Sequence, residues 1–450
     1  MNKKNIVVTH ARDLKETVIL LDALYAVLLI SMLASAFSVQ QVEANPGTMV
    51  VPDEYSSIQE AIDQARPGAT VHVKAGIYLE HVVVNKNGLR LVGEDRVTTI
   101  IDGGGTGSVV YVEANNTFFS GFTVKSSGRN MYDSGISLHH SFNTSVSSNS
   151  VINNNLGIYL YESSNSILRN NNIADNSYNF GVFGLNLQGY IHNIDVSNIL
   201  DGKPIIYWVN QANKQPPANA GYVGIVNSTN ITVENLTFTK NWQGMLFAYT
   251  ANSTIKNVTA TNNMDGIWLS ECFDCSVYGN NASDNSWGGI ALVNSSRCSV
   301  HCNNANNNIE YGIFLSNSSG NMFYHNNFIN NKRPAWLHGV NNNTWHDGYP
   351  SGGNYWSHYT GVDEKSGSLQ DELGGDGIGD TPYVIDLHNK DYYPLMKPWD
   401  LPPPEAPRTN IVLYVIAGIG TIIIILSIGI YTIKLRKRPS DDSINRVPKA

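Results

Sequence analysis

The stretch SVYGNNASDNSWGGIAL (276–292) is followed, 23 residues after its start, by SVHCNNANNNIEYGIFL (299–315). A fixed period of roughly 20–50 residues indicates a repeat architecture. Each copy ends in a short alternation of apolar residues with others, as in Ile290-x-Leu292 and Ile313-x-Leu315. Alternation with a period of two predicts a β-strand with one face turned inward. The two copies therefore predict successive β-coils of one stack.

The glycine that opens this strand recurs along the chain, at Gly135, Gly157, Gly221, Gly244, Gly266, Gly289 and Gly312. All the intervals are 22 or 23 residues except the 64 residues from Gly157 to Gly221, which fit two coils plus a loop of about 18 residues. The repeats show neither a helical stripe nor a leucine-rich frame. We therefore predict an all-β parallel β-helix whose coils stack about 4.8 Å apart and contact only their neighbours.

Asparagine is concentrated between residues 143 and 343. Asn tolerates the left-handed backbone of tight turns, and stacked amides can hydrogen-bond from coil to coil. We expect such a ladder at the Asn that follows an apolar residue by three positions: Asn149, Asn170, Asn280, Asn303 and Asn326. The repeats that contain Asn235 and Asn257 place this residue one position earlier, which predicts an interruption there.

The composition and the two ends of the chain indicate export. Charged residues make up 15% and the net charge is −8, and no basic patch outside the last segment favours a nucleic-acid partner. The apolar run 23–39 follows several Lys and Arg residues and predicts a signal peptide or an uncleaved anchor. The run 411–433 is uncharged, long enough to cross a bilayer, and followed at once by basic residues. The positive-inside rule then places the Asn-rich part outside the membrane.

The sequence predicts six successive parts. Residues 1–44 are a signal peptide or N-terminal anchor, residues 45–340 the β-helix, and residues 341–400 a Trp/Tyr/Gly/Asp-rich segment that closes the helix. A Pro-rich linker (401–410), a transmembrane helix (411–433) and a short cytoplasmic tail (434–450) follow.

Four stretches carry a family resemblance. Residues 56–103 (SSIQEAIDQARPGATVHVKAGIYLEHVVVNKNGLRLVGEDRVTTIIDG) look like the start of a pectin-lyase-like right-handed β-helix. In that arrangement Ile58, Ala61, Ile62 and Ala65 form an amphipathic helix that caps the exposed end of the core. The repeats resemble the NosD type, with carbohydrate-binding and sugar-hydrolysis repeats, and residues 192–211, 220–236 and 341–396 are similar to segments of archaeal surface members. The resemblance implies a right-handed helix over about residues 50–400, but not an activity.

The acidic residues give no clear catalytic pair. A glycoside hydrolase needs two carboxylates about 5–10 Å apart. Asp265 and Glu271 flank one predicted strand and are candidates to approach each other. The long interval offers Asp195, Asp201 and Lys203, with Tyr207 nearby, because loops on rigid scaffolds often carry function. The alternative is that these charges are solvated turn residues.

The position two residues after the repeat glycine is expected to face outward. It holds Tyr159, Trp268 and Phe314, with Leu246 and Ala291 between them. Aromatic side chains along a flat β-face are candidates to bind carbohydrate by stacking on sugar rings. Aromatic residues in strands also commonly serve only in packing, and that alternative stays open.

Two cysteines, Cys275 and Cys298, occupy equivalent repeat positions and are expected to stack within disulfide distance. Together with Cys272, Cys302 and His301 they could also form a zinc or copper site. The strand alternation argues against this metal site, since it directs Cys298 and Cys302 inward and His301 outward. We therefore do not expect copper or zinc.

The clearest metal candidate is DELGGDGIGD (371–380). Its closely spaced Asp residues and Gly turns suit calcium, with Asp371, Asp376 and Asp380 as ligands. The alternative is a glycine-rich turn that ends the stack.

The sequence as a whole predicts a single-pass cell-membrane protein with an extracellular β-helix. We expect it to bind polysaccharide or cell-envelope glycan, or to act as an adhesive or structural envelope component, rather than to be an enzyme. The alternatives are a polysaccharide lyase or glycoside hydrolase, and a NosD-like accessory protein for a copper enzyme.

Overall fold

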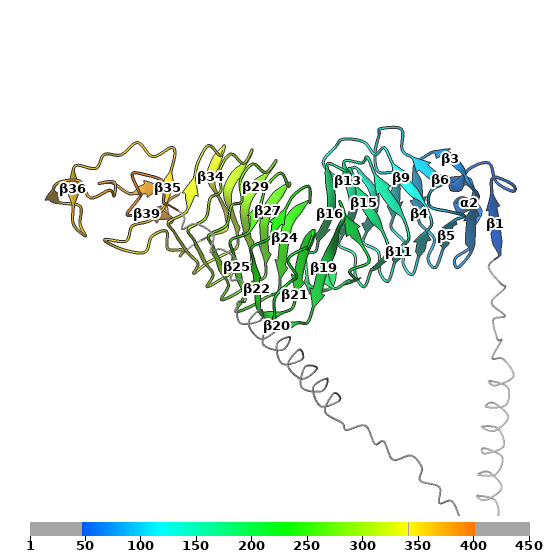
Figure 1. Ribbon diagram of the computed structural model, residues 1–450, viewed down its shortest axis with the longest axis horizontal. Coiled ribbons are helices and arrows are strands. Elements are labelled where there is room, and N and C mark those ends of the chain that lie inside the picture. Colours follow the sequence, from blue (N-terminus) through cyan, green and yellow to red (C-terminus); the bar gives the residue numbers. More distant parts are fainter. Residues whose placement is uncertain (1–46, 341, 401–450) are drawn as a thin grey trace, which may run out of the picture.

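The computed structural model describes residues 47–340 and 342–400, which form a stack of parallel β-coils (Figure 1). Many neighbouring coils are offset by 22 or 23 residues, as in Asn149 with Asn171 and Asn280 with Asn303. Other coils of the first half are longer or shorter, as in Thr70 with Arg90 and Val82 with Val110. The predicted all-β right-handed parallel β-helix and its coil length are therefore confirmed. The predicted signal peptide or anchor, the Pro-rich linker, the membrane helix 411–433 and the tail lie outside the described residues.

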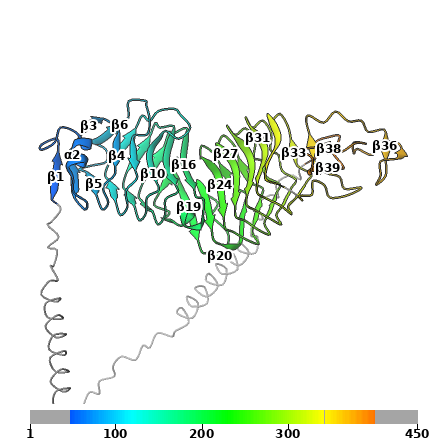
Figure 2. The same ribbon diagram turned by 180° about the vertical axis from the view of Figure 1, so that it is seen from behind.

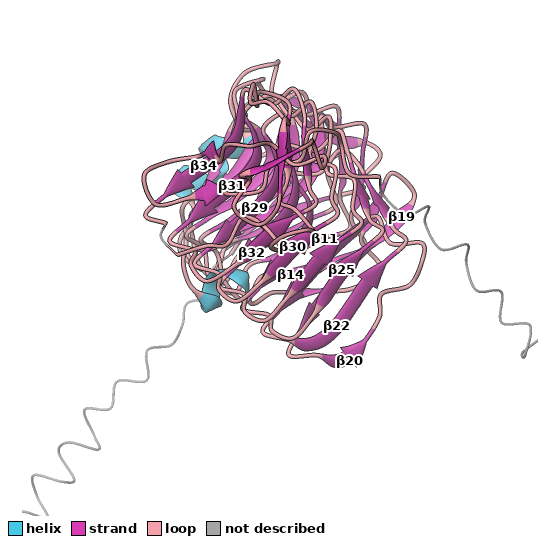
Figure 3. Cartoon of the chain, turned by 90° about the vertical axis from the view of Figure 1, so that its left-hand side faces the viewer, coloured by secondary structure: helices cyan, strands magenta, loops and turns pink. Residues whose placement is uncertain are grey.

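Four sheets of parallel strands run along the stack, and the view along it in Figure 3 shows the coils superimposed. A seven-stranded sheet contains β1 (Thr48–Val51), β2 (Thr70–Val73), β5 (Arg90–Gly93), β8 (Phe118–Ser120), β11 (Ser145–Ser147), β14 (Ile167–Arg169) and β17 (Asn193–Ile194). A five-stranded sheet contains β4 (Val82–Val84), β7 (Val110–Val112), β10 (Ser134–His139), β13 (Leu156–Tyr161) and β16 (Tyr178–Phe183).

The longest sheet spans both halves of the molecule. It has thirteen strands: β3 (Gly76–Leu79), β6 (Thr99–Asp102), β9 (Thr123–Lys125), β12 (Ser150–Ile152), β15 (Asn172–Ala174), β18 (Ile199–Leu200), β19 (Lys203–Val209), β21 (Tyr222–Val226), β24 (Gln243–Ala248), β27 (Asp265–Ser270), β29 (Gly288–Val293), β31 (Tyr311–Ser316) and β34 (Arg333–His338). A six-stranded sheet contains β20 (Ala212–Lys214), β22 (Thr229–Glu234), β25 (Thr254–Lys256), β28 (Ser276–Tyr278), β30 (Ser299–His301) and β32 (Met322–Tyr324).

Four short pairs complete the described strands. They are β23 (Thr237–Phe238) with β26 (Thr259–Ala260), β33 (Asn327–Phe328) with β35 (Tyr355–Trp356), β36 (Lys365–Ser366) with β37 (Glu372–Leu373), and β38 (Tyr383–Val384) with β39 (Lys390–Asp391). The last two pairs are antiparallel hairpins in the C-terminal segment.

The stack changes direction at β19, so the molecule consists of an N-terminal arm and a C-terminal arm (Figures 1 and 2). β18 and β19 are antiparallel, and the next coil is shortened, since Ile205 pairs with Tyr222 at an offset of 17 residues. A 3-10 helix, η1 (Leu187–Tyr190), precedes this junction. The sequence predicts two coils and a loop for the 64-residue interval. In the structure this interval contains β16, the helix η1, the turn between β18 and β19, and one short coil.

The core shows why the chain turns at β19. The buried apolar residues form two large clusters. The first fills the N-terminal arm and continues to Leu246 and Ala248 of β24, and the second fills the C-terminal arm. Tyr207 packs into the cluster of the N-terminal arm, whereas its neighbour Ile206 packs into that of the C-terminal arm. Both faces of β19 are thus buried, which fixes the two arms against each other, because successive side chains of a strand point to opposite faces.

Buried asparagines form the expected ladder inside the turns. The amide Nδ2 of Asn280 donates to Asn303 Oδ1 at 2.9 Å, and Asn303 donates to Asn326 at 2.9 Å. In the N-terminal arm the prediction is off by one residue, because Asn149 donates to Asn171 and not to Asn170. Asn170 instead takes the left-handed turn position beside it, with φ of 53°.

The predicted interruption of the ladder is also seen. Asn235 and Asn257 lie at left-handed turn positions with φ of 57° and 52°, and the buried row of the C-terminal arm begins at Asn280, which accepts the backbone N–H of Val258.

Both ends of the described core are covered. The predicted capping helix is α2 (Ile58–Gln64), with Ile58, Ala61 and Ile62 buried and Ser57 as its N-cap. At the other end Trp345 stacks on Phe323 at 4.5 Å and Trp356 on Phe328 at 4.7 Å. Covering the last coil protects an otherwise exposed sheet end from pairing with another chain.

Candidate binding groove between the two arms

A groove of about 390 Å³ is lined by residues of both arms, from β13 and β16 on one side and from β27, β31 and β34 on the other. It is lined by Met131, Tyr132, Tyr159, Tyr161, Phe183, Trp242, Met264, Asp265, Trp268, Trp287, Tyr311, Phe314 and Trp336. Ten of these thirteen side chains are aromatic, and one is acidic. Such an apolar concave surface with few polar groups is typical of a ligand site.

The floor of the groove is the contact that joins the arms. Trp242 donates its backbone N–H to Phe180 in β16 at 2.9 Å, and the Gln243 side-chain amide donates to Val182 at 2.8 Å. β16 is the last strand of the five-stranded sheet, and these two bonds satisfy backbone carbonyl groups on its free edge. Gly181 is required at this contact, because a Cβ there would lie 2.5 Å from the Cβ of Trp242.

Aromatic rings of the N-terminal arm pack on that floor. Tyr159 and Tyr132 lie 5.1 and 5.5 Å from the ring of Trp242, and Tyr161 stacks on Phe183 at 5.5 Å. Tyr159 is only 3% exposed, so it supports the groove wall, whereas Tyr161 and Phe183 are half-buried. The Tyr161 ring is stacked between His139, at 4.7 Å, and Phe183.

The wall of the C-terminal arm is one column of residues in register. Trp268 pairs with Ala291, Ala291 with Phe314, and Phe314 with Trp336. The three aromatic residues are half-buried, and the Phe314 and Trp336 rings lie 5.1 Å apart. Ala291 leaves a gap between Trp268 and Phe314, which are two coils, or about 10 Å, apart along the stack.

One carboxyl group reaches this wall. Tyr311 donates its hydroxyl to Asp265, 46 residues earlier in the chain, at 2.5 Å. The ring crosses the intervening coil over Gly288, where a Cβ would come within 1.9 Å of the Tyr311 ring. Burial raises the pKa of Asp265 to about 7, against the opposing effect of the hydrogen bonds from Tyr311 and the Gly288 N–H. The groove therefore holds a carboxyl that changes charge near neutral pH.

The three predicted carbohydrate-binding residues, Tyr159, Trp268 and Phe314, all line this groove. Sequence reasoning named Asp265 only as a catalytic candidate and missed the other lining residues. Trp336 could have been found, since it continues the column of Phe314 one coil further. Trp242 gives no comparable signal, because its place depends on how the arms meet.

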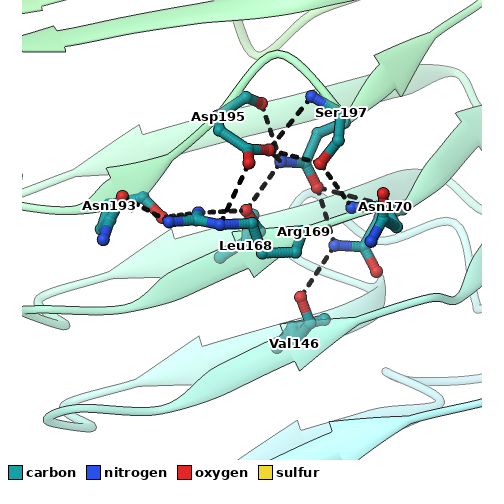
Figure 4. Close-up of polar contacts among 9 residues, drawn as sticks. Val146, Leu168, Arg169, Asn170, Asn193, Asp195 and Ser197 are labelled. Atoms are coloured by element: carbon teal, nitrogen blue, oxygen red, sulfur yellow. Dashed lines mark hydrogen bonds and ion pairs between the residues drawn. The ribbon is translucent and has the colours of Figure 1, made fainter.

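The catalytic candidates of the long interval do not form a reactive group. Asp195 is paired with Arg169 at 3.1 Å and accepts the Ser197 hydroxyl, closing a turn (Figure 4). Asp201 accepts from the Asn179 amide at 2.8 Å, and Lys203 is exposed at the start of β19. These residues hold the junction of the arms together.

The structure does not bring Asp265 and Glu271 together. They stand at opposite ends of β27, about 20 Å apart at the usual rise of a strand. Asp265 faces the aromatic groove, whereas Glu271 accepts from the Asn294 amide at 2.8 Å in a separate shallow depression.

Two of the three predicted calcium ligands accept hydrogen bonds from nearby backbone N–H groups. Asp376 accepts the N–H of Ile378 at 3.0 Å, and Asp380 accepts the N–H of Lys365 at 3.1 Å. Asp371 is exposed. Within residues 47–340 and 342–400, no group of three or more His, Cys, Asp and Glu side chains is arranged to hold a metal ion. Calcium binding by this loop stays a prediction.

The four cysteines are free thiols in the structure, and Cys272, Cys275 and Cys298 are buried. Cys298 lies in the core as its alternation predicts, but Cys302 takes a left-handed turn with φ of 54° and is half-buried. A hydrogen bond with Cys272 and burial raise the pKa of the Cys275 thiol to about 12. The disulfide between Cys275 and Cys298 stays a prediction.

A right-handed parallel β-helix with an aromatic groove between two arms is the class of protein that these observations define. Within it, the chain belongs to the family described as periplasmic copper-binding protein (NosD), whose model matches residues 36–203 and 191–361. The predicted resemblance to the NosD type is thereby confirmed, whereas the likeness to archaeal surface members stays a prediction. None of the curated proteins matches the sequence.

Several solved structures are similar in fold. The A-module of mannuronan C-5 epimerase AlgE4 from Azotobacter vinelandii is 18% identical, with a TM-score of 0.31 over 64% of this chain and 94% of that one. An alginate lyase from Paenibacillus sp. str. FPU-7 is 13% identical, with a TM-score of 0.27 over 69% and 98%. Pectin methylesterase from carrot is 12% identical, with a TM-score of 0.27 over 70% and 87%.

The family description implies copper, and the donor set of the described residues does not fit it. His301 is stacked between Tyr278 and Tyr324 at 5.0 and 4.8 Å on the outside of the coil. The thiol of Cys298 lies in the core on the other face of the same wall. Soft thiolate and imidazole ligands must converge on a copper ion, and here they point apart.

In the part of the chain that the structure describes, no helix is both long enough and apolar enough to cross a membrane.

Proposed function

We propose that the protein binds polysaccharide in the groove between its two arms. The observation that carries this proposal is the column Trp268, Phe314 and Trp336, which faces Tyr161 and Phe183 across the groove. Half-buried aromatic rings offer a flat apolar surface to a sugar ring, and their fixed spacing along the stack suits a repeating chain. The nearby Asp265 carboxyl supplies a polar partner for hydroxyl groups.

The binding domain is proposed to lie outside the cytoplasm. The family is described as periplasmic, and the apolar runs 23–39 and 411–433 are those of an exported, anchored chain. The ligand would then be a cell-envelope or environmental glycan, and the protein an adhesive component of the surface.

A glycan array with the full-length chain, with and without calcium, tests the proposal. Trp268→Ala and Phe314→Ala should each weaken binding about tenfold or more, because loss of one stacked aromatic ring removes on the order of 1–2 kcal/mol. The matched control is Tyr278→Ala, a half-buried aromatic residue stacked on His301 outside the groove. Loss of binding in calcium-free wells would assign a role to Asp371, Asp376 and Asp380.

The same wells should be assayed for unsaturated and reducing-end products. Equal affinity of wild type and both groove variants, or no binding to any glycan, would contradict the proposal. Product formation would replace it with a lyase or hydrolase. The structure does not favour a two-carboxylate hydrolase at this groove, since Asp265 is the one acidic side chain among its described lining residues.

A role linked to copper is the second candidate, and it comes from the description of the family. Mass spectrometry of the native chain after incubation with copper would test it. Stoichiometric copper that survives dialysis would favour this candidate. It would also require ligands other than a cluster of the described residues.

A further inference from the structure

The charges around the groove carry an inference about the class of glycan, which rests on the proposed function. Lys, Arg and His are absent from the described lining residues, and the one charged group among them, Asp265, is acidic. Beside the groove, the Arg333 guanidinium lies 4.6 Å from the ring centre of Trp336 at the end of the column, and His139 and His140 pack on Tyr161 at 4.7 and 5.7 Å. Lys332, next to Arg333, is paired with Glu310 at 2.7 Å.

A uronate polymer would bring a carboxylate on every ring into this surface. Each carboxylate would leave water for an aromatic wall without a cation to pair with it, which is strongly unfavourable. Asp265 in its ionised form would add like-charge repulsion. A neutral sugar meets neither penalty.

The carboxyl of Asp265 suits hydroxyl groups. It offers about four acceptor positions, and the Tyr311 hydroxyl donates to one of its oxygens. Asp265 lines the groove, although only 4% of its surface is exposed. Sugar hydroxyls are donors of the kind that such a partly satisfied carboxyl accepts.

We infer that the groove selects neutral polysaccharide, with rings stacked on Trp268, Phe314 and Trp336 and hydroxyls bound to Asp265, and that it rejects polyuronates. This choice follows from the side chains of this chain alone. Alginate and pectin, as polyuronates, would then not be ligands of this groove.

Calorimetric titration of the full-length chain tests the inference with matched ligands. The probes are hexasaccharides of (1→4)-linked glucose, mannose and galactose, and the same oligomers oxidised at C6 to uronates. At least one neutral oligomer should bind on the order of 100-fold more tightly than its oxidised counterpart. Arg333→Gln should change the neutral affinity less than about twofold, because exposed charges contribute little.

Three outcomes separate the two proposals. Tighter binding of an oxidised oligomer, lost in Trp268→Ala, would overturn the neutral class and leave the binding groove standing. If that binding were also lost in Arg333→Gln, the Arg333 end of the column would be the uronate site, again contradicting the inference. Binding of either class that is unchanged in Trp268→Ala would overturn the groove itself.

Discussion

Asp265 beside the groove and Asp391 in the C-terminal closure are both buried carboxyl groups, but they have different hydrogen-bond partners. Burial raises the pKa of both to about 7. Asp391 accepts the N–H groups of Asn354 at 2.7 Å, the Trp356 indole at 2.9 Å and Tyr393 at 3.1 Å. These bonds fasten the closing turn, so the carboxyl is enclosed by donors of its own chain.

Asp265 has fewer partners of its own and lines an open groove. The contrast shows that a raised pKa does not by itself mark a functional group. Both carboxyls are buried, so their partners make the difference: Asp391 is enclosed by backbone and indole donors, whereas Asp265 accepts the Tyr311 hydroxyl and lines the groove.

The largest effect is expected from breaking the closure. Asp391→Ala leaves three buried N–H donors without an acceptor and should lower the free energy of unfolding by about 3–5 kcal/mol. Urea unfolding measures this loss, with Asp371→Ala, an exposed position, as the control that changes stability by less than about 0.5 kcal/mol. A loss below about 1 kcal/mol at Asp391 would show that the closure does not depend on it.

The Asn ladder connects the closure to the C-terminal arm, since Asn326 donates to Asn354 at 2.8 Å. Asn303→Gly removes the hydrogen bonds of its side-chain amide with Asn280, Asn326 and the Val277 carbonyl, which should lower stability by about 2–4 kcal/mol. Asn307→Gly is the matched control: Asn307 is exposed in an outer row with φ of 55°, which glycine adopts without strain. Equal losses for both variants would argue against a stabilising role of the inner ladder.

The pH dependence of stability tests the shared property of the two carboxyls. In the unfolded chain both groups ionise near pH 4, whereas in the folded chain they keep the proton up to about pH 7. The folded state then binds more protons, so stability should fall as the pH rises from about 4 to 7, by roughly 1–3 kcal/mol for each group. Thermal unfolding of Asp265→Asn across this range should show a shallower fall than wild type. An identical slope would contradict the raised pKa of Asp265.

The smallest expected effect is a change in the pKa of the Asp265 carboxyl. Tyr311→Phe removes the hydroxyl that donates to Asp265. That hydrogen bond lowers the pKa of Asp265, so its loss should raise the pKa further, and stability should fall by about 1 kcal/mol. Carboxyl carbon chemical shifts followed by NMR over pH report the pKa directly. A lower pKa in the variant would mean that the hydroxyl does not stabilise the ionised form.

The repeats predict most of this fold because each coil is built from local signals. The spacing from Gly266 to Gly289 and Gly312 sets the coil length, and alternation places Trp268 and Phe314 on one outward column. The sequence does not predict which residue of a turn points inward. Asn170 and Asn171 are adjacent, and the structure shows that Asn171 joins the buried ladder.

The groove itself could not be read from the repeats. It exists because the stack bends at β19, where a 17-residue coil and an antiparallel turn interrupt the period. The contact between Tyr311 and Asp265, by contrast, lies within the C-terminal arm, where Asp265, Gly288 and Tyr311 are in register on successive coils. The contact of Trp242 with Phe180 follows from how the arms meet, which the repeat pattern does not encode.

The central claim, that the groove between the arms is a glycan site, is tested most directly by a crystal structure with the tightest neutral oligosaccharide from the array. We predict sugar rings against Trp268 and Phe314 and a hydroxyl within hydrogen-bond distance of Asp265. A ligand bound elsewhere, for example beside the stack of Tyr278, His301 and Tyr324, with the groove filled only by water, would contradict this account.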